Sequence, residues 1–151
     1  MGMRIKIWNT ALALGLVLWG LGISIAVAEE RMAVKAATAT IRSDPNAKAQ
    51  QLWQVEKYHP LLVLEIKNNW CRVKDFEGDQ GWVQISSLDK TPTVIVKVNR
   101  CNVRSGPGPD KEIAFTVDKG IPFKVLQKKG DWLEVQHADG DRGWVLKSLV
   151  W

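Results

Sequence analysis

Two tryptophans are the residues of this chain whose chemistry best suits the binding of a ligand. Trp70 and Trp132 each follow a turn and begin a predicted strand. Because side chains alternate between the two faces of a strand, Trp132 lies opposite Leu133 and Val135, which we expect to be buried. Each tryptophan then faces outward or borders a groove, where its flat apolar ring and its single donor suit a peptide or a glycan. The alternative is that each tryptophan only packs across its own hairpin.

Charged side chains near Trp132 complete the candidate site. Asp131 precedes the tryptophan, Glu134 follows it on the same face of the strand, and Arg104 stands just before a Gly-Pro-Gly turn. The candidate ligand-binding residues are therefore Trp70, Trp132, Asp131, Glu134 and Arg104. Arg104 also has a structural alternative, in which its guanidinium holds the turn by bonding to a backbone carbonyl or a carboxylate.

The elements that position these residues occur twice in the chain. Arg42, Trp70 and Gly81-Trp82-Val83 recur 62 positions later as Arg104, Trp132 and Gly143-Trp144-Val145. No gap interrupts this register, so the chain is a tandem duplication of one small module. The second copy has Gly106 and Gly108 in its turn where the first has Asp44 and Asn46. These residue types tolerate positive φ, so we expect both copies to keep one turn.

Short runs of branched and aromatic residues, separated by frequent turns, make up each copy. Residues 61–66 and 123–127 are such runs, and Gly130-Asp131 supplies a hairpin turn. No window of twelve residues after residue 28 has a helical apolar stripe, so the predicted class is all-β. Residues 89–92 form a short, semi-stiff connector between a first repeat over residues 29–89 and a second over residues 93–151. Closure of each repeat into a small barrel removes exposed sheet edges.

The N-terminal segment has the features of a secretory signal peptide. Arg4 and Lys6 precede an uncharged run over residues 11–28, and Ala26-Val27-Ala28 ends this run with small residues. We interpret residues 1–28 as a signal peptide that is removed on export to the periplasm or the cell envelope. The alternative is an uncleaved membrane anchor, which is then the only segment that contacts the membrane.

Charge and histidine content exclude several classes of function. Without residues 1–28 the chain keeps 19 basic and 16 acidic residues, a net charge of only +3. We therefore expect no nucleic-acid partner. His59 and His137 have no counterpart in the other repeat, and no His, Cys and carboxylate residues cluster at metal-ligand spacing. The sequence predicts no catalytic residue, no metal and no cofactor.

The two cysteines have two interpretations. An even number of cysteines in an exported protein indicates a disulfide, here between Cys71 and Cys101. Such a bond requires Cα atoms within about 7 Å of each other. Alternatively each cysteine is a small apolar core residue, since Leu133 and Ala39 stand at the equivalent positions of the other repeat.

The second repeat resembles the bacterial SH3 (SH3b) domain family along its whole length. The motifs that carry the resemblance are Asn102-Val103-Arg104-Ser105-Gly106-Pro107-Gly108, Gly130-Asp131-Trp132 and Gly143-Trp144-Val145. The first repeat keeps Trp70 and Gly81-Trp82-Val83 but has Arg42-Ser43-Asp44-Pro45 at its turn. The resemblance implies two tandem SH3-like β-barrels. It does not extend to the proline-peptide pocket of eukaryotic SH3 domains, because residues 146–149 lack the aromatic residue and the proline of that pocket.

The resemblance also implies a function. SH3b domains of exported bacterial proteins are generally non-catalytic modules that bind cell-wall (peptidoglycan) peptides or envelope proteins. The alternative is a structural or assembly protein that braces an envelope complex by protein–protein contacts. Trp53 and Trp151 have no counterpart in the other repeat, and we expect them to cover the surface between the repeats. Because the copies differ mainly in their loops, we expect them to differ in ligand; the oligomeric state stays open.

Overall fold

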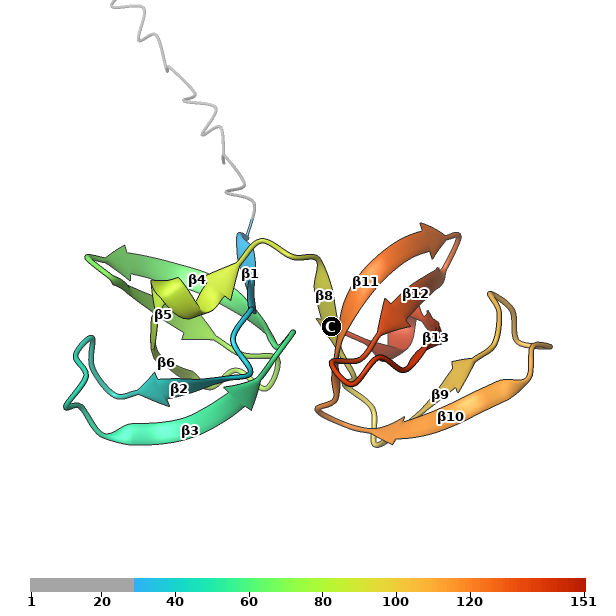
Figure 1. The fold of residues 1–151 in the computed structure, drawn as a ribbon, viewed down its shortest axis with the longest axis horizontal. Coiled ribbons are helices and arrows are strands. Elements are labelled where there is room, and N and C mark those ends of the chain that lie inside the picture. Colours follow the sequence, from blue (N-terminus) through green and yellow to red (C-terminus); the bar gives the residue numbers. More distant parts are fainter. Residues whose placement is uncertain (1–28) are drawn as a thin grey trace, which may run out of the picture.

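The protein folds into two β-sheets that lie side by side, as Figure 1 shows. The structure, a computed structural model, describes residues 29–151. The segment interpreted as a signal peptide, residues 1–28, lies outside this range. Within it the chain forms thirteen strands and two short 3-10 helices, so the all-β prediction is confirmed. None of the described helices is long and apolar enough to cross a membrane.

The first sheet contains the strands up to Asp89. They are β1 (Arg31–Val34), β2 (Thr38–Arg42), β3 (Gln51–Glu56), β4 (Pro60–Lys67), β5 (Trp70–Lys74), β6 (Gln80–Gln84) and β7 (Leu88–Asp89), with a 3-10 helix at Ile85–Ser87. Their order across the sheet is β3-β2-β6-β5-β4-β1-β7, and every pairing is antiparallel.

The second sheet repeats this order. Its strands are β8 (Thr93–Ile95), β9 (Arg100–Arg104), β10 (Ile113–Asp118), β11 (Pro122–Lys129), β12 (Trp132–Gln136) and β13 (Arg142–Leu146), and a 3-10 helix spans Lys147–Leu149. Their order is β10-β9-β13-β12-β11-β8. Strands β9 to β13 each begin and end 62 residues after β2 to β6, so the duplication seen in the sequence is a duplication of structure.

Each sheet encloses its own hydrophobic core. In β5 the buried side chains are Cys71 and Val73, while the flanking residues of the strand face outward. Val55 of β3 and Leu88 of β7 come from opposite ends of the first sheet, yet they belong to one buried cluster. The sheet therefore curls around its core. A second cluster in the other sheet contains Cys101.

The cysteines do not form the disulfide that their even number indicates. Both thiols are free and buried, Cys71 in the first core and Cys101 in the second. The disulfide prediction is wrong because each cysteine packs inside its own sheet, which supports the alternative of small apolar core residues. Burial raises the pKa of the Cys71 thiol to about 11, with a smaller contribution from Glu30, and burial also raises the pKa of Cys101.

Both copies keep the same turn after the arginine, as predicted. The Ser43 N–H donates to the Gln50 carbonyl at 3.0 Å, and the Ser105 N–H donates to the Glu112 carbonyl at 2.9 Å, 62 residues later. The expectation of positive φ in this turn is wrong. The residues with positive φ are found in other turns, among them Asn68 with φ 53° and its equivalent Gly130 with φ 58°. A Cβ atom on Gly106 would lie 3.1 Å from Cγ of the flexible Lys111 side chain, and the same turn accommodates Asp44 at the equivalent position of the first repeat. The two copies thus share positive φ at the β4–β5 hairpin and its equivalent, and not at the turn after the arginine.

An ion pair and cation–π contacts join the two sheets. Lys119 Nζ lies 2.6 Å from Glu77 Oε1 and 5.7 Å from the centre of the Phe76 ring. The Arg31 guanidinium stacks on the Trp151 ring at 3.8 Å, so Trp151 lies between the repeats as expected. Trp53 packs against the first core and lines a hollow that Gly120 of the second repeat also borders.

Candidate functional site

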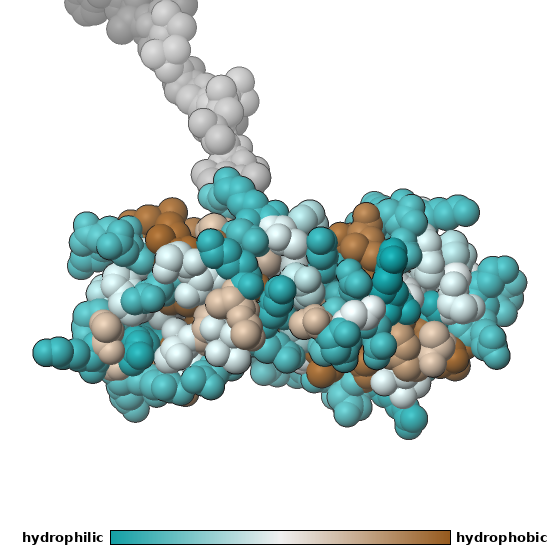
Figure 2. Space-filling model, in the orientation of Figure 1, coloured by the Kyte–Doolittle hydropathy of each residue, from teal (hydrophilic) through white to brown (hydrophobic). Residues whose placement is uncertain are grey.

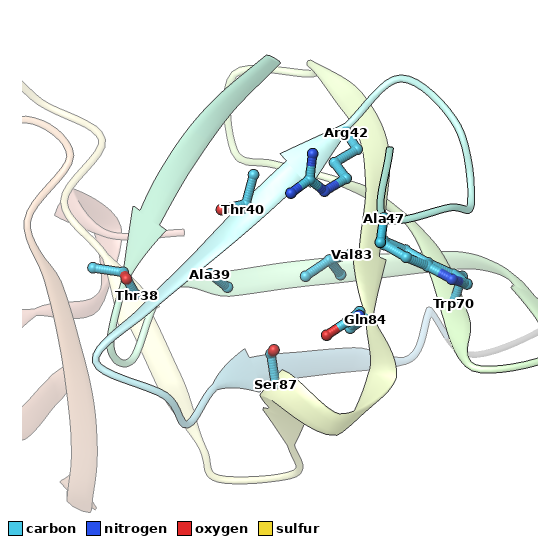
Figure 3. A pocket seen from close by; sticks show the side chains of 9 residues that line it. All are labelled: Thr38, Ala39, Thr40, Arg42, Ala47, Trp70, Val83, Gln84 and Ser87. Carbon is cyan, nitrogen blue, oxygen red and sulfur yellow. The ribbon is translucent and has the colours of Figure 1, made fainter. Parts of the chain in front are cut away.

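A groove on the outer side of the first sheet contains Trp70 and Arg42. Groove 1, as we call it, has a volume of about 220 Å³ and is lined by Thr38, Ala39, Thr40, Arg42, Ala47, Trp70, Val83, Gln84 and Ser87. Figure 3 shows Thr38 at one end and Trp70 at the other, with Thr40, Gln84 and Ser87 between them.

The second sheet has a groove at the same place. Groove 2 has a volume of about 200 Å³ and is lined by Arg100, Asn102, Arg104, Pro109, Trp132, Leu146 and Leu149. Each of these residues stands 62 positions after a residue that lines groove 1. The duplication has therefore preserved a surface hollow together with the cores.

Strand pairing explains why the arginine and the tryptophan meet. Trp132 pairs with Leu146 across β12 and β13, and Trp144 of β13 pairs with Arg104 of β9. The β9–β13 contact is close at Gly143, where a Cβ atom would lie 2.9 Å from the Arg104 carbonyl oxygen. A side chain at this position would push the strands apart. Leu133 is buried, so its neighbour Trp132 points outward into the groove.

The arginines hold the loops that border the grooves. Arg42 Nη1 donates a hydrogen bond to the Ala49 carbonyl at 2.8 Å, and Arg104 Nη1 donates to the Lys111 carbonyl at 2.7 Å. This is the structural role that the sequence left open. It engages one of the several N–H donors of each guanidinium, which leaves others for a ligand.

The structure brings together only some of the predicted site residues. Arg104 and Trp132 line groove 2, and Trp70 lines groove 1. Asp131 is exposed and borders a neighbouring hollow. Glu134 accepts hydrogen bonds from Gln127 Nε2 at 2.6 Å and from Arg142 Nη2 at 3.2 Å, so its carboxylate is engaged within the sheet.

Several lining residues of groove 2 were not anticipated. They are Arg100, Asn102, Pro109, Leu146 and Leu149. A signal for two of them was present, because Arg100 and Asn102 alternate with Cys101 and Val103, which are buried. Counting back from Arg104 in steps of two along β9 finds both residues on the outward face.

Another hollow lies where the repeats meet. His59, Asp75, Phe76 and Glu77 line it from the first repeat. The His59 side chain is buried, Nε2 has no hydrogen-bond partner, and burial lowers its pKa from 6.5 to about 4. Asp75 Oδ1 accepts hydrogen bonds from the backbone N–H groups of Glu77 and Asp79 at 3.0 and 2.9 Å, which stabilises the β5–β6 turn. Burial nevertheless raises the pKa of Asp75.

The two thiols of the described chain are not activated as nucleophiles. A thiol whose pKa is raised by burial stays protonated at neutral pH and is a poor nucleophile, and this holds for Cys71 and Cys101. His137 Nδ1 lies 2.9 Å from Asp139 Oδ1 in the second repeat. Within residues 29–151, no group of three His, Cys, Asp or Glu side chains is placed to hold a metal ion.

Comparison with known proteins finds the same domain twice. A family model described as "Bacterial SH3 domain" matches residues 35–90 and residues 97–151. YrvJ of Bacillus subtilis, which bears the name "Putative N-acetylmuramoyl-L-alanine amidase", is 38% identical over 56 residues, 37% of this chain and 11% of YrvJ. LytH of Staphylococcus epidermidis, which bears the name "Probable cell wall amidase", is 34% identical over 62 residues, 40% of this chain and 21% of LytH. The chain thus spans about a tenth to a fifth of these relatives.

Two solved structures align with most of the chain at low similarity. An NLPC/P60 family protein from Bacillus cereus is 13% identical, with a TM-score of 0.39, and the alignment covers 81% of this chain and 56% of that one. NlpC1 from Trichomonas vaginalis is 14% identical, with a TM-score of 0.37, and the alignment covers 81% of this chain and 45% of that one.

Proposed function

Because this chain belongs to the bacterial SH3 domain family through both of its repeats, we propose that it is a binding protein of the cell envelope. Its two grooves hold a cell-wall (peptidoglycan) peptide or a segment of an envelope protein. The observation that carries this proposal is the recurrence of one hollow, with its arginine and its tryptophan, at equivalent places in both repeats.

The form of the grooves suits a short extended ligand. Each groove has a volume of about 200 Å³, smaller than a typical site for a drug-sized molecule, and it opens on the surface of a sheet. A tryptophan offers an apolar platform and an indole donor, and the arginine offers N–H groups to carbonyl or carboxylate oxygens. Peptide backbone and side chains match this set.

The same proposal includes the organisation of the chain. Residues 29–89 and 93–151 are two SH3-like barrels, and residues 1–28 are a signal peptide that directs the protein to the periplasm or the cell envelope. The curling of the first sheet around one core supports closure into a barrel. The names of the relatives, both cell-wall amidases, support an envelope location.

We further propose that the protein is not an enzyme. The match to the amidases is confined to a small share of their length, 11% and 21%, and bacterial SH3 domains are usually binding modules. The high pKa values of the buried thiols agree with this.

The direct test is retention of the protein on purified cell-wall sacculi. Wild type and the Trp132→Ala variant are compared with Ile66→Ala, which removes an exposed apolar side chain outside both grooves. We expect Trp132→Ala to reduce retention and Ile66→Ala to leave it unchanged, with circular dichroism to show that all three fold. Equally negligible retention of all three proteins would remove the peptidoglycan version of the proposal.

A structural role in an envelope complex is the second candidate. The ion pair of Lys119 with Glu77 and the stacking of Arg31 on Trp151 favour it, since they join the repeats into one extended body. Under this alternative the grooves contribute nothing to partner binding, so a partner captured by crosslinking stays bound to the Trp132→Ala variant.

A further inference from the structure

We infer that the two grooves select different ligands, and that groove 2 selects a peptide that carries a carboxylate. This inference rests on the proposed function, because it names the ligand class of the same grooves. It starts from a comparison of equivalent positions. Both grooves keep the arginine and the tryptophan, while Thr38, Thr40, Ala47, Gln84 and Ser87 are replaced by Arg100, Asn102, Pro109, Leu146 and Leu149.

The first difference is charge. Groove 2 is lined by two guanidinium groups, those of Arg100 and Arg104, and by no carboxylate, whereas Arg42 is the one charged residue that lines groove 1. Arg100 is exposed. Asp118 stands opposite it on β10, but in residues 29–151 no ion pair forms with Arg100. Paired guanidinium groups bind carboxylates through charge-assisted hydrogen bonds, which are stronger than neutral ones.

The second difference is polarity. Groove 1 offers the hydroxyl groups of Thr38, Thr40 and Ser87 and the amide of Gln84. At two of these four positions groove 2 is apolar, since Leu146 replaces Gln84 and Leu149 replaces Ser87. Together with Pro109 they join Trp132 in an apolar wall. Apolar walls with few charged anchors fit a peptide whose side chains are partly apolar, and the hydroxyl-rich groove fits an uncharged polar ligand.

A neighbouring hollow extends the basic character of groove 2. Leu146 lines both, and the neighbouring hollow, of about 550 Å³, is also lined by Lys97, Lys147, Ser148, Val150 and Asp131. One carboxylate is thus outnumbered by two ammonium groups. In the first repeat Ile85 stands at the position of Lys147, so that side has one lysine fewer. A ligand that runs from Trp132 past Leu146 meets positive charge along its length.

The experiment uses the indole N–H signals of Trp70 and Trp132 as separate reporters of the two grooves. Two probes are titrated into ¹⁵N-labelled protein: the peptide Ac-Ala-Glu-Ala-Ala with its free carboxylates, and the uncharged analogue Ac-Ala-Gln-Ala-Ala-amide. We expect the charged peptide to shift the Trp132 signal with an affinity about tenfold higher than that of the analogue, and to leave Trp70 unshifted.

Exchange of equivalent residues supplies matched variants. Arg100→Thr puts the residue of groove 1 into groove 2 and should abolish the preference for the charged peptide. Thr38→Arg makes the reverse change and should let the Trp70 signal respond. Both sites are outward-facing strand positions, and the NMR spectrum itself reports whether each variant folds.

Four outcomes would overturn the inference. They are equal affinity for the two peptides, an unchanged preference in Arg100→Thr, equal shifts of both indoles, or no shift with the charged peptide. If inorganic phosphate shifts the Trp132 signal but the charged peptide does not, the inference is also overturned, and the result points to an anionic polymer as the ligand. If Trp132→Ala reduces retention on sacculi and Arg100→Thr does not, the proposed function stands and this inference is refuted.

Discussion

Replacement of His59 by isoleucine should remove a large part of the acid sensitivity of this protein. His59 is buried at the joint of the repeats, Nε2 has no hydrogen-bond partner, and its ring centroid lies 6.1 Å from that of Phe76. The second repeat has Ile121 at the equivalent position, so the His59→Ile variant copies a residue that this fold already accommodates.

The magnitude follows from the pKa of the histidine. Burial lowers the pKa of His59 from 6.5 to about 4, so the unfolded chain binds the proton more tightly than the folded protein. The stability that depends on neutral His59 is therefore fully present above pH 6.5, and it is lost as the pH falls from 6.5 toward 4. Each pKa unit corresponds to about 1.4 kcal/mol, which sets the full loss at about 3 kcal/mol.

Other groups affect this interval less, or in the opposite direction. The raised pKa of Asp75, caused chiefly by burial, means that the folded protein takes up this proton first, which adds stability as the pH falls. The pKa of Asp139 is lowered, mainly by the hydrogen bond from the Asp141 backbone. The stability that this carboxylate contributes is therefore lost only when the pH falls below the ordinary pKa of an aspartate, outside the interval of His59. Both groups are unchanged in His59→Ile.

The assay is urea unfolding of wild type and variant at pH 7.5, 5.5 and 4.5. We expect the free energy of unfolding of wild type to fall by about 1 kcal/mol more than that of the variant by pH 5.5, and by more at pH 4.5. At pH 7.5 the variant should be at least as stable, because it removes an unpartnered buried nitrogen. Parallel pH profiles for the two proteins would refute the assignment of acid sensitivity to His59.

Three further predictions concern the packing of Gly143, the two buried thiols and the ion pair between the repeats. Gly143→Ala should lower the free energy of unfolding by about 2 kcal/mol, because the new Cβ would lie 2.5 Å from Val103 Cγ1. An unchanged denaturation midpoint would contradict this, since it would mean that β9 and β13 can move apart without loss of stability. Cys71 and Cys101 should react with a thiol reagent only after unfolding, and reductant should not change the melting temperature; a mass two hydrogens lower before reduction would instead reveal a disulfide. Lys119→Ala should lower the free energy of unfolding by less than about 1 kcal/mol, and by less at high salt, because its ion pair with Glu77 is half exposed. A larger loss that does not depend on salt would contradict the interpretation of this contact as a surface ion pair.

The duplicated register predicted most of the fold. The interval of 62 residues aligns strands β2 to β6 with β9 to β13, and alternation alone predicts that Cys71 and Val73 are buried and that Trp70 faces outward. Local patterns sufficed here because each strand has one buried face.

The composition of the site depended on pairings that the sequence does not encode locally. Arg104 and Trp132 share a groove because β13 lies between β9 and β12 in the sheet, whereas Glu134, two residues from Trp132, is engaged by Arg142. The disulfide prediction was wrong for a related reason, since counting cysteines says nothing about which core each one enters.

The positions of exposed apolar side chains do not predict where the grooves lie. Figure 2 shows apolar residues scattered over one face among polar ones, and Ile66, 56% exposed, borders neither groove. The grooves are instead marked by a tryptophan beside an arginine at the same place in both repeats. Repetition of a hollow is therefore a better guide to function here than hydropathy.

Crosslinking from within the grooves in living cells tests the central claim most directly. A photoreactive amino acid is placed at Gln84 in groove 1, at Pro109 in groove 2, and at Ile66 outside both, all three being exposed positions. We predict that the groove positions crosslink to cell-wall material or to one envelope protein and that the Ile66 position does not. Crosslinks from Ile66 alone, or none from Gln84 and Pro109 in a correctly exported protein, would contradict the claim that the grooves are binding sites.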